Sequence, residues 1–221
     1  MTAIFSDAFN VIKKRSRILI FAVTLVYVLS FSLGFLTGSF FEFFSQERQE
    51  QIKVLVNQTV AYLGPLRGLT KSNQYSVLGT LIFLNNLKTS FLISIAGILI
   101  IPTFFFIFSN AMISGLFLGL AYKGIIVIYS PIEIFGLIFV FALELLSLIF
   151  ASVEGVYLGI SFLFTKKLYR RKMSRTQALK MTARETWKVY KMIIVMLVIA
   201  ALLETIIIYS LTIRQVGILV T

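Results

Sequence analysis

The chain alternates long apolar runs with polar segments, and five of the runs are long enough to cross a bilayer. A transmembrane helix needs about 20 apolar residues to span a hydrocarbon core of about 30 Å. The pattern therefore predicts an all-α, polytopic membrane helix bundle with about five transmembrane helices. The runs are Ile18 to Phe41, Leu87 to Phe108, Met112 to Tyr129, Ile132 to Phe164 and Met192 to Ile213.

The fourth run is longer than a single crossing requires. Its 33 residues would reach about 50 Å as a straight helix. A tilt, a protruding end, a kink, or a re-entrant piece followed by a span would each accommodate that length. The sequence leaves these geometries open.

The segment 42–86 is the longest polar stretch between the predicted spans and the only sizeable region expected outside the cell. Ile52, Leu55, Val56 and Val60 recur at helical spacing, which predicts an amphipathic helix from Glu42 to Leu63. Such a helix could lie on the outer face of the bundle or in the membrane interface, or it could dock a partner protein outside the cell.

Composition excludes most soluble enzyme chemistry. Hydrophobic residues make up 58% of the chain and charged residues only 14%, whereas soluble domains carry about 25% charge. There is no cysteine and no histidine, so thiolate or histidine metal sites and Ser–His or Cys–His nucleophiles are excluded. No glycine-rich phosphate loop follows a strand pattern. We therefore predict a protein that is not an enzyme and has no cofactor and no metal site.

The distribution of basic residues predicts the orientation. Four basic residues precede the first run, within residues 1–17, and ten lie in segment 165–191, which together make fourteen of the 21 in the chain. The positive-inside rule places both segments in the cytoplasm, and five spans then place the tail 214–221 outside. The net charge of +12 thus indicates topology and not nucleic-acid binding. The first run has no cleavage pattern and is expected to be retained as an anchor.

Segment 165–191 mixes basic and apolar residues, as expected of a basic helix at an anionic lipid surface on the cytoplasmic face. Thr182 and Glu185 have capping-box spacing, which suggests that a second helical piece starts there. A lipid-anchored connector is the leading interpretation, and a regulatory or partner site is the alternative.

Three glutamates, Glu144, Glu154 and Glu204, lie inside apolar runs, where a carboxylate costs roughly 2.5 to 3.5 kcal/mol. No basic residue lies deep in the spans to pair with them. The leading interpretation is that they tie helices together through hydrogen bonds, with Asn86 and Asn110 among the polar candidates. Alternatively, Glu144 and Glu204 line a path for protons, cations or a cationic solute, or contact a partner within the membrane. Glu154 lies about 15 Å along the helix from Glu144, so a shared site would need a bend.

Small residues repeat every four positions on two of the runs, which brings them to one helix face where a neighbouring helix can approach closely. From these faces we predict self-association, with a dimer favoured. The predicted packing residues are Gly115 and Gly119 in the third run and Ser147, Ala151, Gly155 and Gly159 in the fourth.

Three ordered motifs between residues 80 and 213 resemble the stage II sporulation protein M family. Asn85–Asn86, followed by Gly97 and then by Asn110, Gly115 and Gly119, looks like the family's Asn-Asn entry and glycine-containing helices. Glu144 with the small residues that follow it, and the alanine-rich segment that ends in Glu204, are similar to two further family motifs. The chain has Phe139, Val140 and Phe141 where the family often has a Pro-His-Gly group, and Glu154 has no family counterpart.

The resemblance implies a multispanning membrane scaffold that, in its sporulation setting, works with cell-wall hydrolases during membrane remodelling. We therefore expect a non-enzymatic scaffold or assembly component in the cell membrane, with a membrane or extracytoplasmic protein as partner. A transporter, channel or permease subunit that uses Glu144 and Glu204 is the alternative.

Overall fold

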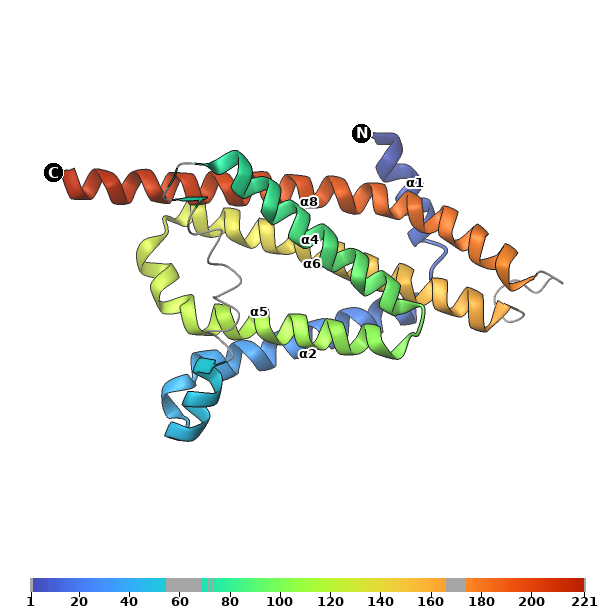
Figure 1. The fold of residues 1–221 in the computed structure, drawn as a ribbon, viewed down its shortest axis with the longest axis horizontal. Helices are drawn as coiled ribbons and strands as arrows, with labels where there is room; N and C mark the ends of the chain where they lie inside the picture. The colour runs from blue at the N-terminus through green and yellow to red at the C-terminus, as the bar shows by residue number, and fades with distance from the viewer. Residues whose placement is uncertain (1, 55–68, 71, 73, 166–173, 221) are drawn as a thin grey trace.

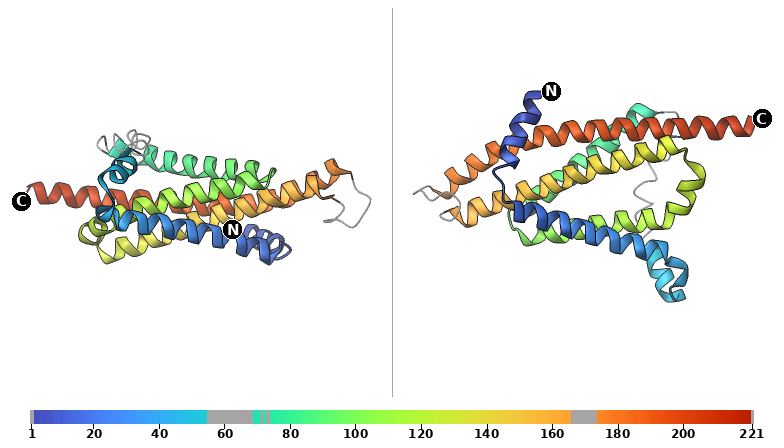
Figure 2. Two further views of the ribbon diagram at one scale, coloured as in Figure 1. Left: turned by 90° about the horizontal axis from the view of Figure 1, so that it is seen from below. Right: turned by 180° about the vertical axis from the view of Figure 1, so that it is seen from behind.

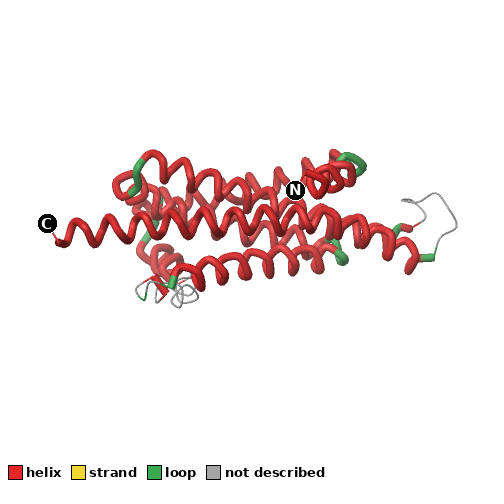
Figure 3. The backbone as a smooth tube through the Cα atoms, turned by 90° about the horizontal axis from the view of Figure 1, so that it is seen from above, coloured by secondary structure: helices red, strands yellow, loops and turns green. Residues whose placement is uncertain are grey.

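The computed structural model describes residues 2–54, 69, 70, 72, 74–165 and 174–220, and every regular element in these parts of the chain is helical (Figure 3). Five helices are long and apolar enough to cross a membrane, so the predicted all-α membrane bundle is confirmed. In chain order the elements are α1 (Thr2–Ile12), α2 (Arg17–Ser39), the 3-10 turn η1 (Phe41–Phe43), α4 (Tyr75–Gly97), α5 (Ile101–Ile128), α6 (Pro131–Leu163) and α8 (Arg175–Val220).

The five long helices form two groups (Figures 1 and 2). Helices α2 and α5 lie side by side, and α4, α6 and α8 pack together above them in the view of Figure 1. The short helix α1 crosses α8 near the end of the molecule where α2 begins. Ala8 and Val11 of α1 are buried in one apolar cluster with Val189 and Ile193 of α8. The first helix is therefore part of the folded body.

Glycines bring the backbones of α2 and α5 together. A methyl group added at Gly115 would lie 2.1 Å from the carbonyl oxygen of Phe31, and one added at Gly34 would lie 2.1 Å from that of Met112. At Gly38 and Gly119, one turn further along each helix, the added methyl would lie 2.4 Å and 2.2 Å from carbonyl oxygens of the other helix. Only hydrogen fits at these positions, so the two helices interlock through a small-residue contact of the kind that drives helix association in membranes.

A second close contact joins α4 to α6. Gly97 of α4 packs on the backbone of Gly155, and Gly159 packs on the carbonyl oxygen of Gly97. Beside them, the Ser94 hydroxyl donates a 2.7 Å hydrogen bond to the carbonyl of Ala151. Both glycine contacts are made within one chain.

Helix α6 is continuous over 33 residues, without the break that the length of its run left open. Ser130 begins the helix with a capping box to Glu133, and Pro131 occupies the first turn, where its missing N–H costs nothing. The Ser210 hydroxyl of α8 donates a 2.7 Å hydrogen bond to Glu133. The start of α6 is thereby tied to the last turns of α8.

The second and third membrane helices lie at other positions than their predicted runs. Helix α4 begins at Tyr75 instead of Leu87 and ends at Gly97, and α5 already begins at Ile101. The predicted second run, Leu87 to Phe108, therefore contains the turn between them. The residues of this turn are apolar, so the hydrophobic pattern of the run does not reveal it. Within the turn, Ile100 adopts a positive φ of 62°, a conformation that usually favours glycine.

Helix α8 also differs from its predicted limits. It runs without interruption from Arg175 to Val220, so no helical piece begins at Thr182, and the predicted tail from 214 to 220 continues the helix. The start is capped instead by Ser174 and Gln177, which exchange side-chain and backbone hydrogen bonds of 3.2 Å. Thr182 is fully buried, and Glu185 takes part in an ion pair described below.

The predicted outer amphipathic helix lies largely beyond what the structure describes. Residues 46–54 are helical after η1, and Ile52 among them is partly buried. Leu55, Val56 and Val60 lie outside the described residues, as do residues 166–173 of the basic segment.

Replacing Tyr190 with phenylalanine tests the contact between α8 and α4. The buried Tyr190 hydroxyl lies 2.9 Å from the carbonyl of Ser90 and also contacts the Ser94 hydroxyl. Its loss should destabilise the fold by about 1 kcal/mol, the net worth of a typical hydrogen bond. Thermal unfolding in detergent measures this, with Tyr209→Phe on the exposed face of α8 as the control that should leave stability unchanged.

Candidate functional site

A cavity of about 520 Å³ lies between the two groups of helices. All five membrane helices contribute to its wall, so it belongs to one chain and needs no second copy to form it. Its polar lining residues are Asn85, Asn86 and Thr89 of α4, Asn110 and Ser114 of α5, and Glu144 of α6. Its aromatic lining residues are Tyr27, Phe31, Phe117 and Phe141.

Three of the predicted polar residues therefore meet at this cavity. Glu144 lies 13 residues into α6, near the middle of the apolar stretch, and accepts a hydrogen bond from the side-chain amide of Asn86. Asn110 lines the cavity from the opposite group of helices. The cavity thus places a carboxylate, amides and hydroxyls together among the apolar stretches of the five long helices, where polar groups are costly unless they serve a structural or binding role.

Glu204 does not line this cavity. It lies half-buried on α8, close enough to Glu144 for the two charges to interact. None of the hydrogen bonds between described residues involves Glu204. The two glutamates that the sequence paired are neighbours, but the structure brings only Glu144 to the cavity.

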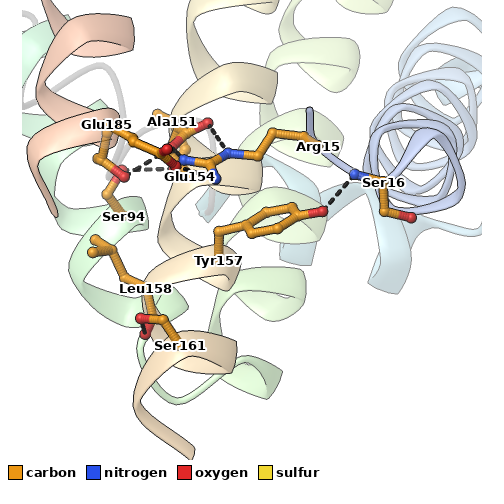
Figure 4. Close-up of polar contacts among 10 residues, drawn as sticks. Arg15, Ser16, Ser94, Ala151, Glu154, Tyr157, Leu158, Ser161 and Glu185 are labelled. Carbon is orange, nitrogen blue, oxygen red and sulfur yellow. Dashed lines mark hydrogen bonds and ion pairs between the residues drawn. The ribbon is translucent and has the colours of Figure 1, made fainter. Parts of the chain in front are cut away.

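Glu154 belongs to a separate site near the far end of α6 (Figure 4). It is 1% exposed and forms a two-pronged ion pair with Arg15, with distances of 2.9 Å from Nε to Oε1 and 2.7 Å from Nη2 to Oε2. The Thr186 hydroxyl of α8 donates a further 2.8 Å hydrogen bond to Glu154. Glu185 accepts a 3.0 Å hydrogen bond from Nη1 of Arg15. We call these four residues the ion-pair cluster.

Tyr157 completes the surroundings of Arg15. The guanidinium carbon lies 4.4 Å from the centre of the Tyr157 ring, a cation–π distance, and the tyrosine hydroxyl accepts a hydrogen bond from the backbone N–H of Ser16. Burial by itself lowers the pKa of Arg15, but the hydrogen bond and charge of Glu154, together with Glu185, outweigh it and raise the pKa above its ordinary value. Arg15 therefore stays charged and joins the α1–α2 connection to α6 and α8.

The predicted small-residue faces are occupied within the chain. Gly115 and Gly119 pack on α2, and Gly155 and Gly159 pack on α4. The Ala151 carbonyl accepts from Ser94, and the buried Ser147 hydroxyl donates to the carbonyl of Leu143 in its own helix. These faces hold the bundle together, so the predicted dimer must rest on other surfaces and stays a prediction.

The sequence did not identify Arg15 as the partner of Glu154. Arg15 stands in a basic cluster with Lys13, Lys14 and Arg17, all three of which are exposed, and the cluster indicated only topology. One signal was available: Glu154 lies about two and a half turns before the end of α6, within reach of groups at the membrane surface.

Cysteine labelling tests whether the cavity holds water. The chain has no cysteine, so each introduced thiol reports alone. Ser114→Cys should react with a water-soluble methanethiosulfonate reagent, because thiolate forms only where water reaches the sulfur. Ser147→Cys, at a fully buried position of α6, should react at least about tenfold more slowly. Labelling of Ser114→Cys as slow as that expected of the buried Ser147→Cys would show that the cavity is dry.

Comparison with known proteins identifies the family. The model of the family described as stage II sporulation protein M matches residues 23–207, which contain all five membrane helices in whole or in part. Searches of the curated proteins and of the solved structures each found no match. The match includes Glu144, Glu154 and Glu204 but not Arg15. The chain therefore belongs to the stage II sporulation protein M family.

Proposed function

We propose that this membrane protein is a non-enzymatic scaffold or assembly component: a rigid body that holds a partner protein at the membrane. The observation that carries the proposal is the ion-pair cluster, which fastens a juxtamembrane helix to two membrane helices. A buried charge pair adds little net stability compared with apolar packing, so we infer that this one serves to fix the geometry of the bundle. A scaffold needs such fixed geometry at the surface that it presents.

Exposed basic residues surround that end of the bundle. The large number of basic residues favours a cytoplasmic location for this end of the bundle. There they face anionic lipid headgroups and any acidic surface of a partner protein. They lie on α1 and its connection to α2, and on the first half of α8: Lys13, Lys14, Arg17, Arg175, Lys180, Arg184, Lys188 and Lys191. We call them the basic end.

Transport through the cavity is the second candidate function. The cavity and its carboxylate favour it. Two observations oppose it. Glu204 does not line the cavity. The backbones of α2 and α5 touch at Gly115, and those of α4 and α6 touch at Gly155, so neither pair of helices has space to slide. Alternating access requires helix groups to rock against each other, and the ion-pair cluster joins the start of α2 to α6 and α8.

Site-specific photo-crosslinking tests the scaffold function. A benzophenone amino acid at Arg184, on the exposed basic end, should capture one defined protein in cells of the native host. The same probe at Phe105, 69% exposed on the apolar face of α5, should capture lipid. Arg15→Gln should reduce the protein adduct several-fold by releasing α1, whereas Arg17→Gln should not. Adducts equally weak at positions 184 and 105 would contradict the proposal.

A further inference from the structure

The chemistry of the cavity is selective about charge. Among the described residues that line it, Glu144 is the only acidic one, and none is a lysine or an arginine. The Asn86 amide donates to Oε1, and Oε2 accepts no hydrogen bond from a described residue. No described residue forms an ion pair with Glu144 either, in contrast to Glu154. An ionised Glu144 at this depth would be stabilised by a bound cation.

The surrounding groups suit a cation with N–H donors. The side-chain oxygens of Asn85, Asn110, Thr89 and Ser114 can accept hydrogen bonds, so several acceptors face the space beside one carboxylate. A cavity of about 520 Å³ lies within the range of about 300 to 1,000 Å³ that small-molecule sites occupy.

The aromatic walls discriminate between kinds of cation. The rings of Phe31 and Phe141 lie 4.9 Å apart, and Tyr27 is buried beside the same space. Aromatic faces attract organic ammonium groups. A calcium ion, in contrast, takes six to eight oxygen ligands and favours several carboxylates. The described residues contain no group of three acidic, histidine or cysteine side chains that could hold a metal.

We propose that this cavity is a binding site for an organic ammonium group, which pairs with Glu144 and lies against the aromatic wall. The ammonium comes either from a free amine or from the headgroup of a phosphatidylethanolamine lipid that enters between the helices. The site binds its ligand without passing it across the membrane. This inference does not depend on the scaffold function, because a ligand can bind whether or not a partner docks at the basic end.

The test uses the full chain in nanodiscs of phosphatidylglycerol, which carries no amine. Ethylammonium chloride should raise the thermal unfolding midpoint of the wild type, since a ligand that binds the folded state stabilises it by mass action. Potassium chloride at equal ionic strength should not. In Glu144→Gln the ethylammonium affinity should fall about tenfold or more, as expected for the loss of a charged hydrogen-bond partner. Glu50→Gln removes the same charge at an exposed position and should respond like the wild type.

A second arm replaces part of the phosphatidylglycerol with phosphatidylethanolamine. A rise in midpoint that is lost in Glu144→Gln supports the site and identifies a lipid headgroup as its ligand, whereas a response to ethylammonium alone identifies a free amine. If Glu144→Gln fails to fold, ethylammonium should still slow the labelling of Ser114→Cys by a neutral thiol reagent, and Asn110→Leu should weaken the midpoint shift. No stabilisation in either arm, or equal stabilisation of wild type and Glu144→Gln, overturns the proposal. Neither result bears on crosslinking at position 184.

Discussion

Arg15→Gln is expected to destabilise the folded protein by about 3 to 5 kcal/mol, because it leaves the carboxylate of Glu154 buried without its partner. Glu154 is 1% exposed and receives both prongs of the guanidinium, so its carboxylate would lose two hydrogen bonds and its counter-charge at a position remote from bulk water. Trp187 is the only tryptophan and follows Thr186 of the ion-pair cluster directly in sequence. Its fluorescence during denaturant unfolding in detergent therefore reports the loss.

Three further variants define the origin of that effect. Arg17→Gln removes a charge two residues away at an exposed position and should change stability by less than about 0.5 kcal/mol. The stability loss in Arg15→Lys should lie between those of Arg15→Gln and Arg17→Gln, because the lysine ammonium keeps the charge but cannot form the two-pronged contact. The double variant Arg15→Leu with Glu154→Leu should recover much of the loss, since no unpaired charge remains. If Arg15→Gln matched Arg17→Gln, the cluster would not support the fold.

Gly115→Ala is expected to cost about 3 kcal/mol or more, whereas Gly136→Ala should be close to neutral. At Gly115 the added methyl lies 2.1 Å from a backbone oxygen of α2, which can move only if the helices separate. At Gly136 it lies 3.0 Å from the end of the flexible Ile207 side chain. In both variants, alanine also favours the helical conformation over glycine by up to about 1 kcal/mol, which acts against the cost of the added methyl.

The two alanine variants carry the same chemical change, so their difference isolates the helix contact. Thermal midpoints in one detergent give the comparison. Gly34→Ala, the reciprocal substitution on α2, should resemble Gly115→Ala. Equal tolerance at Gly115 and Gly136 would mean that α2 and α5 do not interlock, and the rigid-body interpretation would lose the support that it draws from this contact beside the ion-pair cluster.

The number of membrane helices could be predicted from the sequence because each contains a long apolar stretch, whatever its neighbours. Their limits could not always be predicted. Helix α4 carries Asn85, Asn86 and Thr89 where it faces the cavity. These polar residues lower its mean hydropathy below that of a helix that faces only lipid. The turn before α5, residues 98–100, is apolar throughout, so hydropathy does not mark it; the signals that the sequence offered are Gly97 just before the turn and Pro102 just after it.

The candidate site could be predicted only in part. Glu144, Asn86 and Asn110 stood out because polar groups are costly at membrane depth, and the structure places all three at one cavity. The pairing of Glu154 with Arg15 joins positions 139 residues apart. It depends on how α1 crosses α8, and helical periodicity within a run carries no information about such a crossing. The same holds for the small-residue faces, which pack on other helices of the same chain.

The central claim is that the protein is a rigid membrane body that binds at its cavity without conducting through it. Ion flux in proteoliposomes tests this most directly, with the full chain reconstituted and a proton or cation gradient imposed. The scaffold function predicts flux no higher than that of empty liposomes, for the wild type and for Glu144→Gln alike. Flux through the folded wild type that disappears in an equally well folded Glu144→Gln protein would contradict it.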